Sequence, residues 1–258
     1  MEKISVLRER LQGPRRPYDT LYGRYVMRRA SIYLTILFSK LNLSPKFVTF
    51  LSVLCGLLGV CAIFTGHWCG GILLVNGWYL LDHSDGELAR LQARSSLGGL
   101  YFDTIANALI PPFTFLALGA DLERRSGEIL WFMAGSVAAI GYEMLLIIPF
   151  CEAAVLLQWA KASSHAPGVP SAGKADEGPL SLCLKKIFAL LHRLAIFPSA
   201  LPVLTLTLAG TFYLDLRASL FFAQSALLFY AFLVTLVWAL ILIQTIATDK
   251  LDKKYAAP

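Results

Sequence analysis

Charged side chains are scarce in this sequence, and apolar ones dominate it. Asp, Glu, Lys and Arg make up only 16% of the 258 residues, whereas hydrophobic residues make up 57%. A soluble domain of this length does not need so much apolar surface, and several runs are long enough to cross a bilayer as helices. The composition therefore excludes an ordinary soluble enzyme and predicts an all-α, polytopic membrane protein.

Other absences narrow the possible classes of protein further. The five cysteines show no metal-type pairing, and because all lie in or beside apolar runs we interpret them as small core residues. The N-terminus lacks the compact apolar run of a signal peptide, so no cleavage is expected. The net charge of +6 is explained by basic residues that attract the anionic headgroups of the lipid bilayer, and we expect no nucleic-acid partner.

Six transmembrane helices are predicted from the apolar runs. The chain would then comprise a cytoplasmic N-terminal segment (1–46), a transmembrane catalytic domain (47–246) and a cytoplasmic tail (247–258). The expected spans are about 47–66, 68–91, 97–119, 128–157, 183–211 and 218–246.

The N-terminal segment and the basic residues set the expected topology. Residues 18–41 are amphipathic enough for a helix that lies in the membrane interface, and Asn42–Pro45 ends it. With these spans, nineteen of the 23 Lys and Arg fall on one side. The positive-inside rule therefore places both termini and the polar segment 82–107 in the cytoplasm.

Acidic residues between two apolar stretches are the most informative feature of the chain. Ionisable groups at membrane depth are rare, and function is the default hypothesis for them. On a helix Asp82 and Asp85 lie one turn apart, and Asp103 and Asn107 likewise share a face. Converging carboxylates without an obvious basic partner favour a hard cation, such as Mg²⁺ or Mn²⁺.

The spacing of these residues resembles a family signature. Read as Asp-x2-Asp-Gly-x2-Ala-Arg-x8-Gly-x3-Asp-x3-Asp, it is similar to that of the CDP-alcohol phosphotransferases, with Asn107 in place of the last Asp. The N-terminal residues and the segment 81–91 further resemble the branch that contains the di-inositol-phosphate phosphate synthases. Seven of the eight fixed positions agree: Asp82, Asp85, Gly86, Ala89, Arg90, Gly99 and Asp103.

This resemblance implies an activity and a cofactor. The enzyme would move a substituted phosphate from a CDP-linked alcohol (CDP-diacylglycerol or a CDP-polyol) to a hydroxyl acceptor (a polyol phosphate or a lipid), and release CMP. Gly86, Ala89 and Gly99 would admit the cytidine, and Arg90 would contact phosphate. A two-metal site of Mg²⁺ or Mn²⁺ would be held by Asp82, Asp85, Asp103 and Asn107.

Asn107 departs from the pattern at the position of the proposed general base. An amide can bind a metal through its oxygen, but it cannot accept a proton near neutral pH. Three explanations stay open: an engineered Asp→Asn replacement, a natural Asn with another base or an acceptor that needs none, and a protein that binds CDP ligands without turnover.

Several residues outside the signature are further candidates. Arg193 would bind the acceptor's phosphate or carboxylate. His83 and Glu87 are weaker candidates for a base, because they point about 100° or more away from Asp82 on a helix. Glu143 and Glu152 could pair with Arg193 or select a cationic acceptor. A non-catalytic CDP-binding protein and a transporter are the alternative functions, and a homodimer is an open alternative for the assembly.

Overall fold

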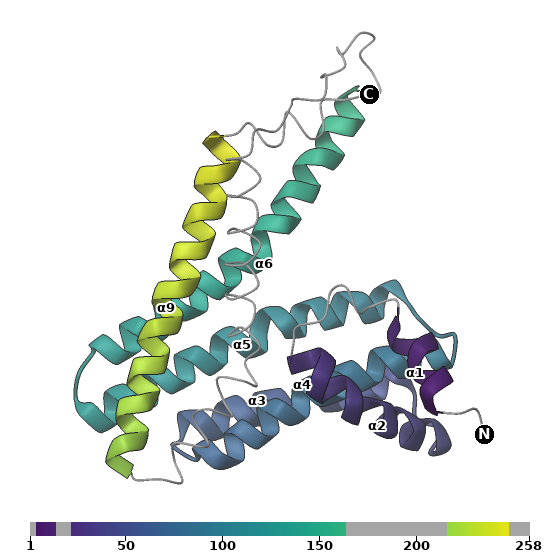
Figure 1. The fold of residues 1–258 in the computed structure, drawn as a ribbon, viewed down its shortest axis with the longest axis horizontal. Coiled ribbons are helices and arrows are strands. Elements are labelled where there is room, and N and C mark those ends of the chain that lie inside the picture. The colour runs from purple at the N-terminus through teal and green to yellow at the C-terminus, as the bar shows by residue number, and fades with distance from the viewer. Residues whose placement is uncertain (1–3, 14–21, 164–215, 248–258) are drawn as a thin grey trace.

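The computed structural model describes residues 4–13, 22–163 and 216–247, and all regular secondary structure in these ranges is helical (Figure 1). The predicted all-α class is confirmed for this part of the chain. In order, the elements are α1 (Ile4–Gln12), the π-helix η2 (Gly23–Met27), α2 (Arg28–Lys40), α3 (Pro45–Phe64), α4 (Trp68–Leu91), α5 (Leu97–Ser126), α6 (Leu130–Ser163) and α9 (Leu216–Ala247).

Four of the described helices are long and apolar enough to cross a membrane, which supports an integral membrane protein. The predicted span 68–91 coincides with α4, but α4 is not one of the four because its polar motif residues lower its hydropathy. The predicted span 183–211 lies outside the described residues, so the number six stays a prediction. The four candidate spans are Pro45–Phe64, Leu97–Ser126, Leu130–Val155 and Leu220–Ile243.

The N-terminal segment contains more helix than the sequence predicts. Within the expected helix over 18–41, η2 and α2 are helical from Gly23 to Lys40, residues 18–21 lie outside the described residues, and a position in the membrane interface stays a prediction; α1 was not predicted. The buried face of α2 is mostly polar and includes Ser31 and Thr35. These side chains need hydrogen-bond partners from another element, and α4 supplies them.

Close helix crossings at glycine hold the first spans together. A Cβ added at Gly59 of α3 would lie 2.8 Å from a methyl of Val75 and 3.0 Å from the carbonyl oxygen of Gly71 in α4. A Cβ at Gly119 of α5 would lie 2.7 Å from the carbonyl oxygen of Trp131 in α6. Only the absence of a side chain lets these backbones approach so closely.

The end of the bundle opposite the motif is fixed by one buried carboxylate. Asp121 near the end of α5 accepts a hydrogen bond from Trp68 Nε1 at 2.7 Å and one from Arg125 Nε at 2.6 Å. Arg125 in turn donates to the carbonyl oxygen of Gly66 at 3.2 Å. Because these residues belong to α5, α4 and the α3–α4 turn, the contacts set the relative positions of three helices.

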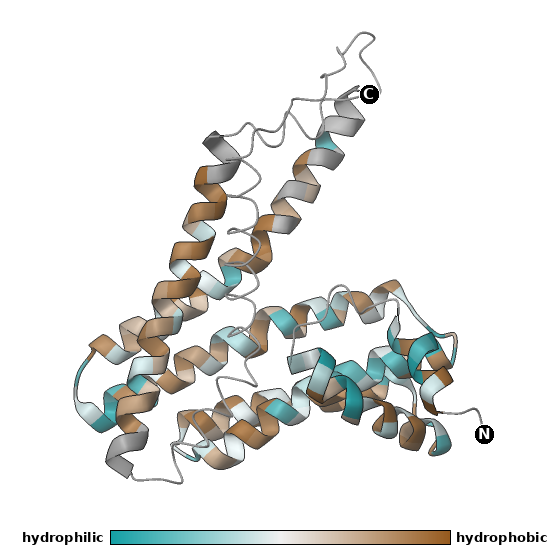
Figure 2. Cartoon of the chain, viewed as in Figure 1, coloured by the Kyte–Doolittle hydropathy of each residue, from teal (hydrophilic) through white to brown (hydrophobic). Residues whose placement is uncertain are grey.

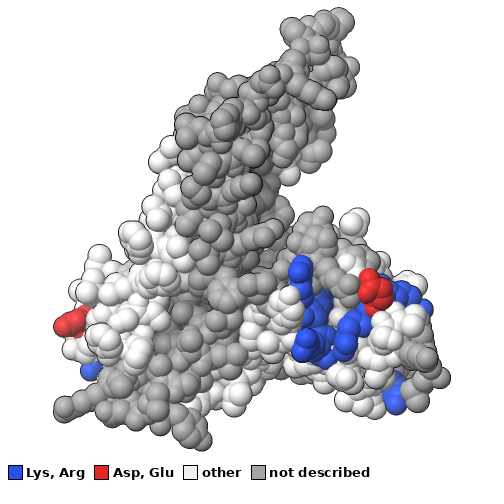
Figure 3. Space-filling view, viewed as in Figure 1, with Lys and Arg blue, Asp and Glu red and all other residues white. Residues whose placement is uncertain are grey.

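Polar and apolar residues are distributed unevenly over the described chain. Hydrophobic residues predominate along α6 and α9, whereas hydrophilic residues are frequent where α1, α2 and the end of α4 meet (Figure 2). Lys and Arg side chains gather over the same end of the molecule (Figure 3). The basic N-terminal helices therefore lie beside the motif half of α4.

Candidate active site

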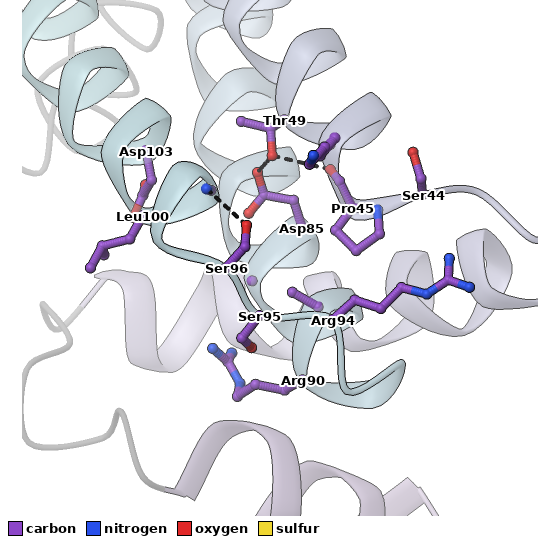
Figure 4. A pocket seen from close by; sticks show the side chains of 14 residues that line it. Ser44, Pro45, Thr49, Asp85, Arg90, Arg94, Ser95, Ser96, Leu100 and Asp103 are labelled. Atoms are coloured by element: carbon purple, nitrogen blue, oxygen red, sulfur yellow. Dashed lines mark hydrogen bonds between the residues drawn. The ribbon is translucent and has the colours of Figure 1, made fainter.

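A cavity of about 310 Å³ lies between the beginnings of α3 and α5 and the C-terminal half of α4 (Figure 4). It includes most of the predicted site residues, which come from α4 and α5. The lining residues are Ser44, Pro45, Lys46, Thr49, Asp85, Gly86, Ala89, Arg90, Arg94, Ser95, Ser96, Gly99, Leu100 and Asp103.

The three carboxylates of the motif lie near one another, two in α4 and one in α5. Asp82 experiences the charges of both Asp103 and Asp85. Asp85 is only 7% exposed and also experiences the charge of Asp103. Repulsion among carboxylates is unfavourable in a site of low dielectric, so the cluster favours a bound cation.

A threonine that the sequence gave no reason to select completes this cluster. Thr49, in the second turn of α3, donates a hydrogen bond from Oγ1 to Asp85 Oδ2 at 2.6 Å (Figure 4). The same hydroxyl contacts the carbonyl oxygen of Pro45 at 3.1 Å, one turn earlier. One carboxylate oxygen of Asp85 is thereby held by a helix that carries none of the motif.

Asn107 contacts the carboxylate one turn before it. Its Nδ2 donates to Asp103 Oδ1 at 3.0 Å and to the carbonyl oxygen of Asp103 at 2.9 Å. Pro111 and Pro112 follow in the same helix and have no N–H group, so the carbonyl groups of Asn107 and Ala108 lack the usual helical partner four residues on. Asn107 therefore acts as a hydrogen-bond donor to Asp103 in this arrangement.

The small residues of the motif leave open space at the cavity. A Cβ added at Gly86 would meet only the terminal nitrogens of Arg90, at 3.5 and 3.8 Å, and no other helix. Gly86, Ala89 and Gly99 all line the cavity. Gly86 thus differs from Gly59 and Gly71, where an added side chain would clash with the backbone of the neighbouring helix.

Positively charged groups also line the cavity. Arg90, Arg94 and Lys46 line it, and Arg90 interacts electrostatically with Asp85. Two helices also begin there: Ser44 caps α3 by accepting from Phe47 N, and Ser96 caps α5 by accepting from Gly99 N. Helix N-termini carry positive partial charge and favour anions.

Glu87 is completely buried, but it does not face the cavity. Its carboxylate accepts hydrogen bonds from Ser31 Oγ at 2.6 Å and Thr35 Oγ1 at 2.9 Å, both in α2. Gln12 Nε2 donates to it at 2.9 Å, and Arg28 lies 3.4 Å away. A carboxylate with four such partners joins the N-terminal helices to the motif helix.

The remaining candidates lie apart from the cavity or outside the described residues. The Nδ1 of His83 contacts the carbonyl oxygen of Tyr79 at 2.9 Å, and its ring packs against that of Tyr79. Glu143 Oε1 is buried and has no hydrogen-bond partner among the described residues. Arg193 lies outside the described residues, and nothing is described of the Glu152 side chain.

No group of three or more His, Cys, Asp or Glu within the described ranges is already arranged as a metal-binding cluster. The chemistry of the residues still fits a hard divalent cation. Asp82, Asp85 and Asp103 present carboxylate oxygens to one another, and the amide oxygen of Asn107 is of the same ligand type.

Comparison with known proteins identifies the class of this chain. The sequence model of the CDP-alcohol phosphatidyltransferase family matches residues 42–248, which is most of the chain. The chain belongs to this family, as the motif predicted. No curated protein matches the chain as a whole at a significant level.

A solved structure supports the fold. The crystal structure of Mycobacterium tuberculosis phosphatidylinositol phosphate synthase with CDP-DAG bound is similar, with a TM-score of 0.54 and 16% sequence identity. The match covers 83% of this chain and 92% of the mycobacterial chain. At this identity the similarity concerns the fold.

Proposed function

We propose that this protein is a membrane-embedded phosphotransferase whose donor is a CDP-linked alcohol. The observation that carries the proposal is that carboxylates and positively charged groups line the same cavity. Asp85 and Asp103 line it together with Arg90, Lys46 and two helix N-termini. A diphosphate bound through divalent metal needs both, since the metal takes carboxylate ligands and the phosphates take donors.

Different residues would bind the metal, the cytidine and the phosphates. Asp82, Asp85 and Asp103, with Asn107, would hold Mg²⁺ or Mn²⁺. The bound metal would neutralise the charge of the diphosphate and of the leaving phosphate. Gly86, Ala89 and Gly99 would let the cytidine lie against the backbone, while Arg90 and Lys46 would bond the phosphate oxygens.

The reaction would exchange one phosphorus–oxygen bond for another. The acceptor hydroxyl attacks the β-phosphorus, a new phosphate ester forms, and the bond to CMP breaks. The acceptor's proton has to leave, and Asn107 cannot take it. The proton would pass to another group or to water. The site would then act mainly by positioning the donor and neutralising charge.

The donor and the setting follow from the family and the similar structure. The mycobacterial structure contains CDP-DAG, so CDP-diacylglycerol is the first donor to test here. CDP-polyols and polyol-phosphate acceptors remain candidates, because the N-terminal and motif residues resemble the branch that contains the di-inositol-phosphate phosphate synthases. The cluster of Lys and Arg around the cavity supports a cytoplasmic active site, because cytoplasmic segments carry an excess of basic residues (Figure 3).

One observation favours a second candidate, a protein that binds CDP ligands without turnover. The amide of Asn107 satisfies Asp103 with a hydrogen bond, and this contact stabilises the ground state without supplying a base. The test is CMP release from labelled CDP-diacylglycerol and from CDP-polyols, with Mg²⁺ and with EDTA. Metal-dependent release supports the transferase, whereas tight binding without release supports the second candidate.

A further inference from the structure

The first helix of the chain docks beside the cavity through two leucines. Leu7 and Leu11 of α1 are 7% and 2% exposed, and they form a buried cluster with Ile32 of α2. Ile36 and Leu91 pack against this cluster. The opposite face of α1 is open, and Val6 is 52% exposed. The apolar contacts therefore fix both the position and the rotation of α1.

The C-terminal end of α1 holds two residues of the motif helix. The carbonyl oxygen of Leu11 accepts a hydrogen bond from Arg90 Nε at 2.8 Å. The next residue, Gln12, donates from Nε2 to Glu87 Oε1 at 2.9 Å and to the carbonyl oxygen of Arg28 at 2.7 Å. Glu87 and Arg90 are three residues apart and so lie on the same side of α4.

The contact to Arg90 has consequences for the cavity. Its guanidinium spans from α1 to the cavity wall, where NH1 and NH2 lie 3.5 and 3.8 Å from the position of a Cβ at Gly86. A long arginine side chain loses rotamer entropy when it is held in one orientation. Because Nε is already hydrogen-bonded to α1, this loss of rotamer entropy is incurred before a ligand binds. The terminal nitrogens of the planar guanidinium lie on the cavity side.

We infer that α1 is a positioning element of the donor cavity, and that Leu11 and Gln12 orient the Arg90 guanidinium toward the diphosphate of a CDP-linked alcohol. The inference rests on the proposed function, because it takes Arg90 as a phosphate contact. It goes further in assigning a role to a helix that precedes residue 42, where the family match begins. Residues 4–12 would tighten donor binding without touching the donor.

A pair of matched variants on α1 tests this inference. Leu7→Asp removes the docking contact, whereas Val6→Asp adds the same charge on the exposed face of the same helix. The affinity of the full chain for CDP-diacylglycerol in detergent, with Mn²⁺, is measured by titration calorimetry. We expect Leu7→Asp to weaken binding about 10-fold, as a lost charge-assisted hydrogen bond does, and Val6→Asp to change it less than about 2-fold.

Double variants separate positioning from general destabilisation. With Arg90→Ala, binding should already be weakened, and adding Leu7→Asp should cost little more. Equal losses from Leu7→Asp with and without Arg90, or no loss at all, would overturn the inference. If Arg90→Ala binds as wild type does, the phosphate role of Arg90 in the proposed function is wrong, and the inference is wrong with it.

A second pair covers the case in which Leu7→Asp does not fold. Gln12→Ala and Thr35→Val each remove one hydrogen bond to Glu87, at 2.9 Å in both, but only the first loosens α1. Both should lower the melting temperature by similar amounts. Only Gln12→Ala should weaken CDP-diacylglycerol binding, by about 3-fold or more, which is a modest fraction of one hydrogen bond. Equal effects of the two variants on binding would show that α1 is merely structural.

Discussion

The side-chain amide of Asn107 donates to the carboxylate of Asp103, with 3.0 Å between Nδ2 and Oδ1. In the family signature the position of Asn107 belongs to a fourth Asp, and two carboxylates at this separation would repel each other unless a cation lay between them. The amide gives Asp103 a neutral partner instead. The site is thereby stabilised in the absence of metal, and the group expected to act as base is missing.

Asn107→Asp should restore that base if an Asp was replaced here. Turnover should then rise by about a hundred-fold or more, the usual worth of general base catalysis, while donor affinity changes little. The measurement is CMP release across pH by both forms, with a panel of donors and acceptors. Vigorous activity of the Asn107 form, unimproved by Asp, would point to another base or to an acceptor that needs none.

Divalent metal should raise the melting temperature through the three motif carboxylates. A ligand that binds only the folded state stabilises it by mass action. Asp82→Ala and Asp103→Ala should abolish the shift caused by Mn²⁺ in a thermal-shift assay. Glu123→Gln, at the far end of α5, is the control and should keep it. Equal shifts in wild type and both Ala variants would rule these residues out as ligands.

Gly86→Leu should abolish CDP-ligand binding in a protein that still folds. The added side chain would project into the cavity and meet no other helix there. Gly70→Leu is the matched control on the same helix, because a Cβ at Gly70 has no atom within 4 Å. Gly71→Leu should instead prevent folding, since its Cβ would lie 2.5 Å from Ile63 Cγ1. Unchanged CDP affinity in Gly86→Leu would contradict the assigned role.

Thr49→Val should weaken metal and donor binding together. The hydroxyl that holds Asp85 Oδ2 at 2.6 Å would be lost, and the carboxylate would be free to rotate. A loss of about 1.5–3 kcal/mol is typical for a hydrogen bond to a charged group, which is on the order of 10- to 100-fold in affinity. Thr104→Val is the control, because the Thr104 hydroxyl donates to the carbonyl oxygen of Leu100 in its own helix.

Ala93→Gly should stabilise the fold by about 0.5–1 kcal/mol. Ala93 directly follows the C-cap of α4 and has a φ of 52°, a left-handed conformation that Gly adopts without steric cost. The increase in melting temperature can be measured with and without ligand. Ala89→Gly in the helix interior has no such strain to relieve and should destabilise by a similar amount. A destabilised Ala93→Gly protein would show that this conformation carries no strain.

The sequence alone predicted the features that depend on local spacing. The helix over 68–91 coincides with α4, and Asp82, Asp85 and Asp103 approach one another as the helical spacing and a short connection require. The all-α class follows from the apolar runs in the same way. Such features need only the period of the helix and the length of the loop between two helices.

Features that depend on contacts between distant elements were not predictable. Thr49 reaches Asp85 only because α3 and α4 cross closely at Gly59 and Gly71. Glu87, a candidate base from the sequence, faces away from the cavity toward α1 and α2, and its hydrogen-bond partners are spread over residues 12–35. The one available signal was a polar stripe, Ser31 and Thr35, on an otherwise amphipathic helix.

The burial of Glu87 also bears on the order in which the protein can be made. The hydrogen-bond donors to its carboxylate lie in residues 12–35, and these leave the ribosome before the motif helix does. A chain that began at residue 42 would lack all of these donors. The carboxylate of Glu87 in α4 would then have none of the hydrogen-bond partners described above. The first forty residues therefore supply the hydrogen-bond donors that this buried carboxylate needs, and a chain shortened to begin at residue 42 should accumulate poorly in the membrane.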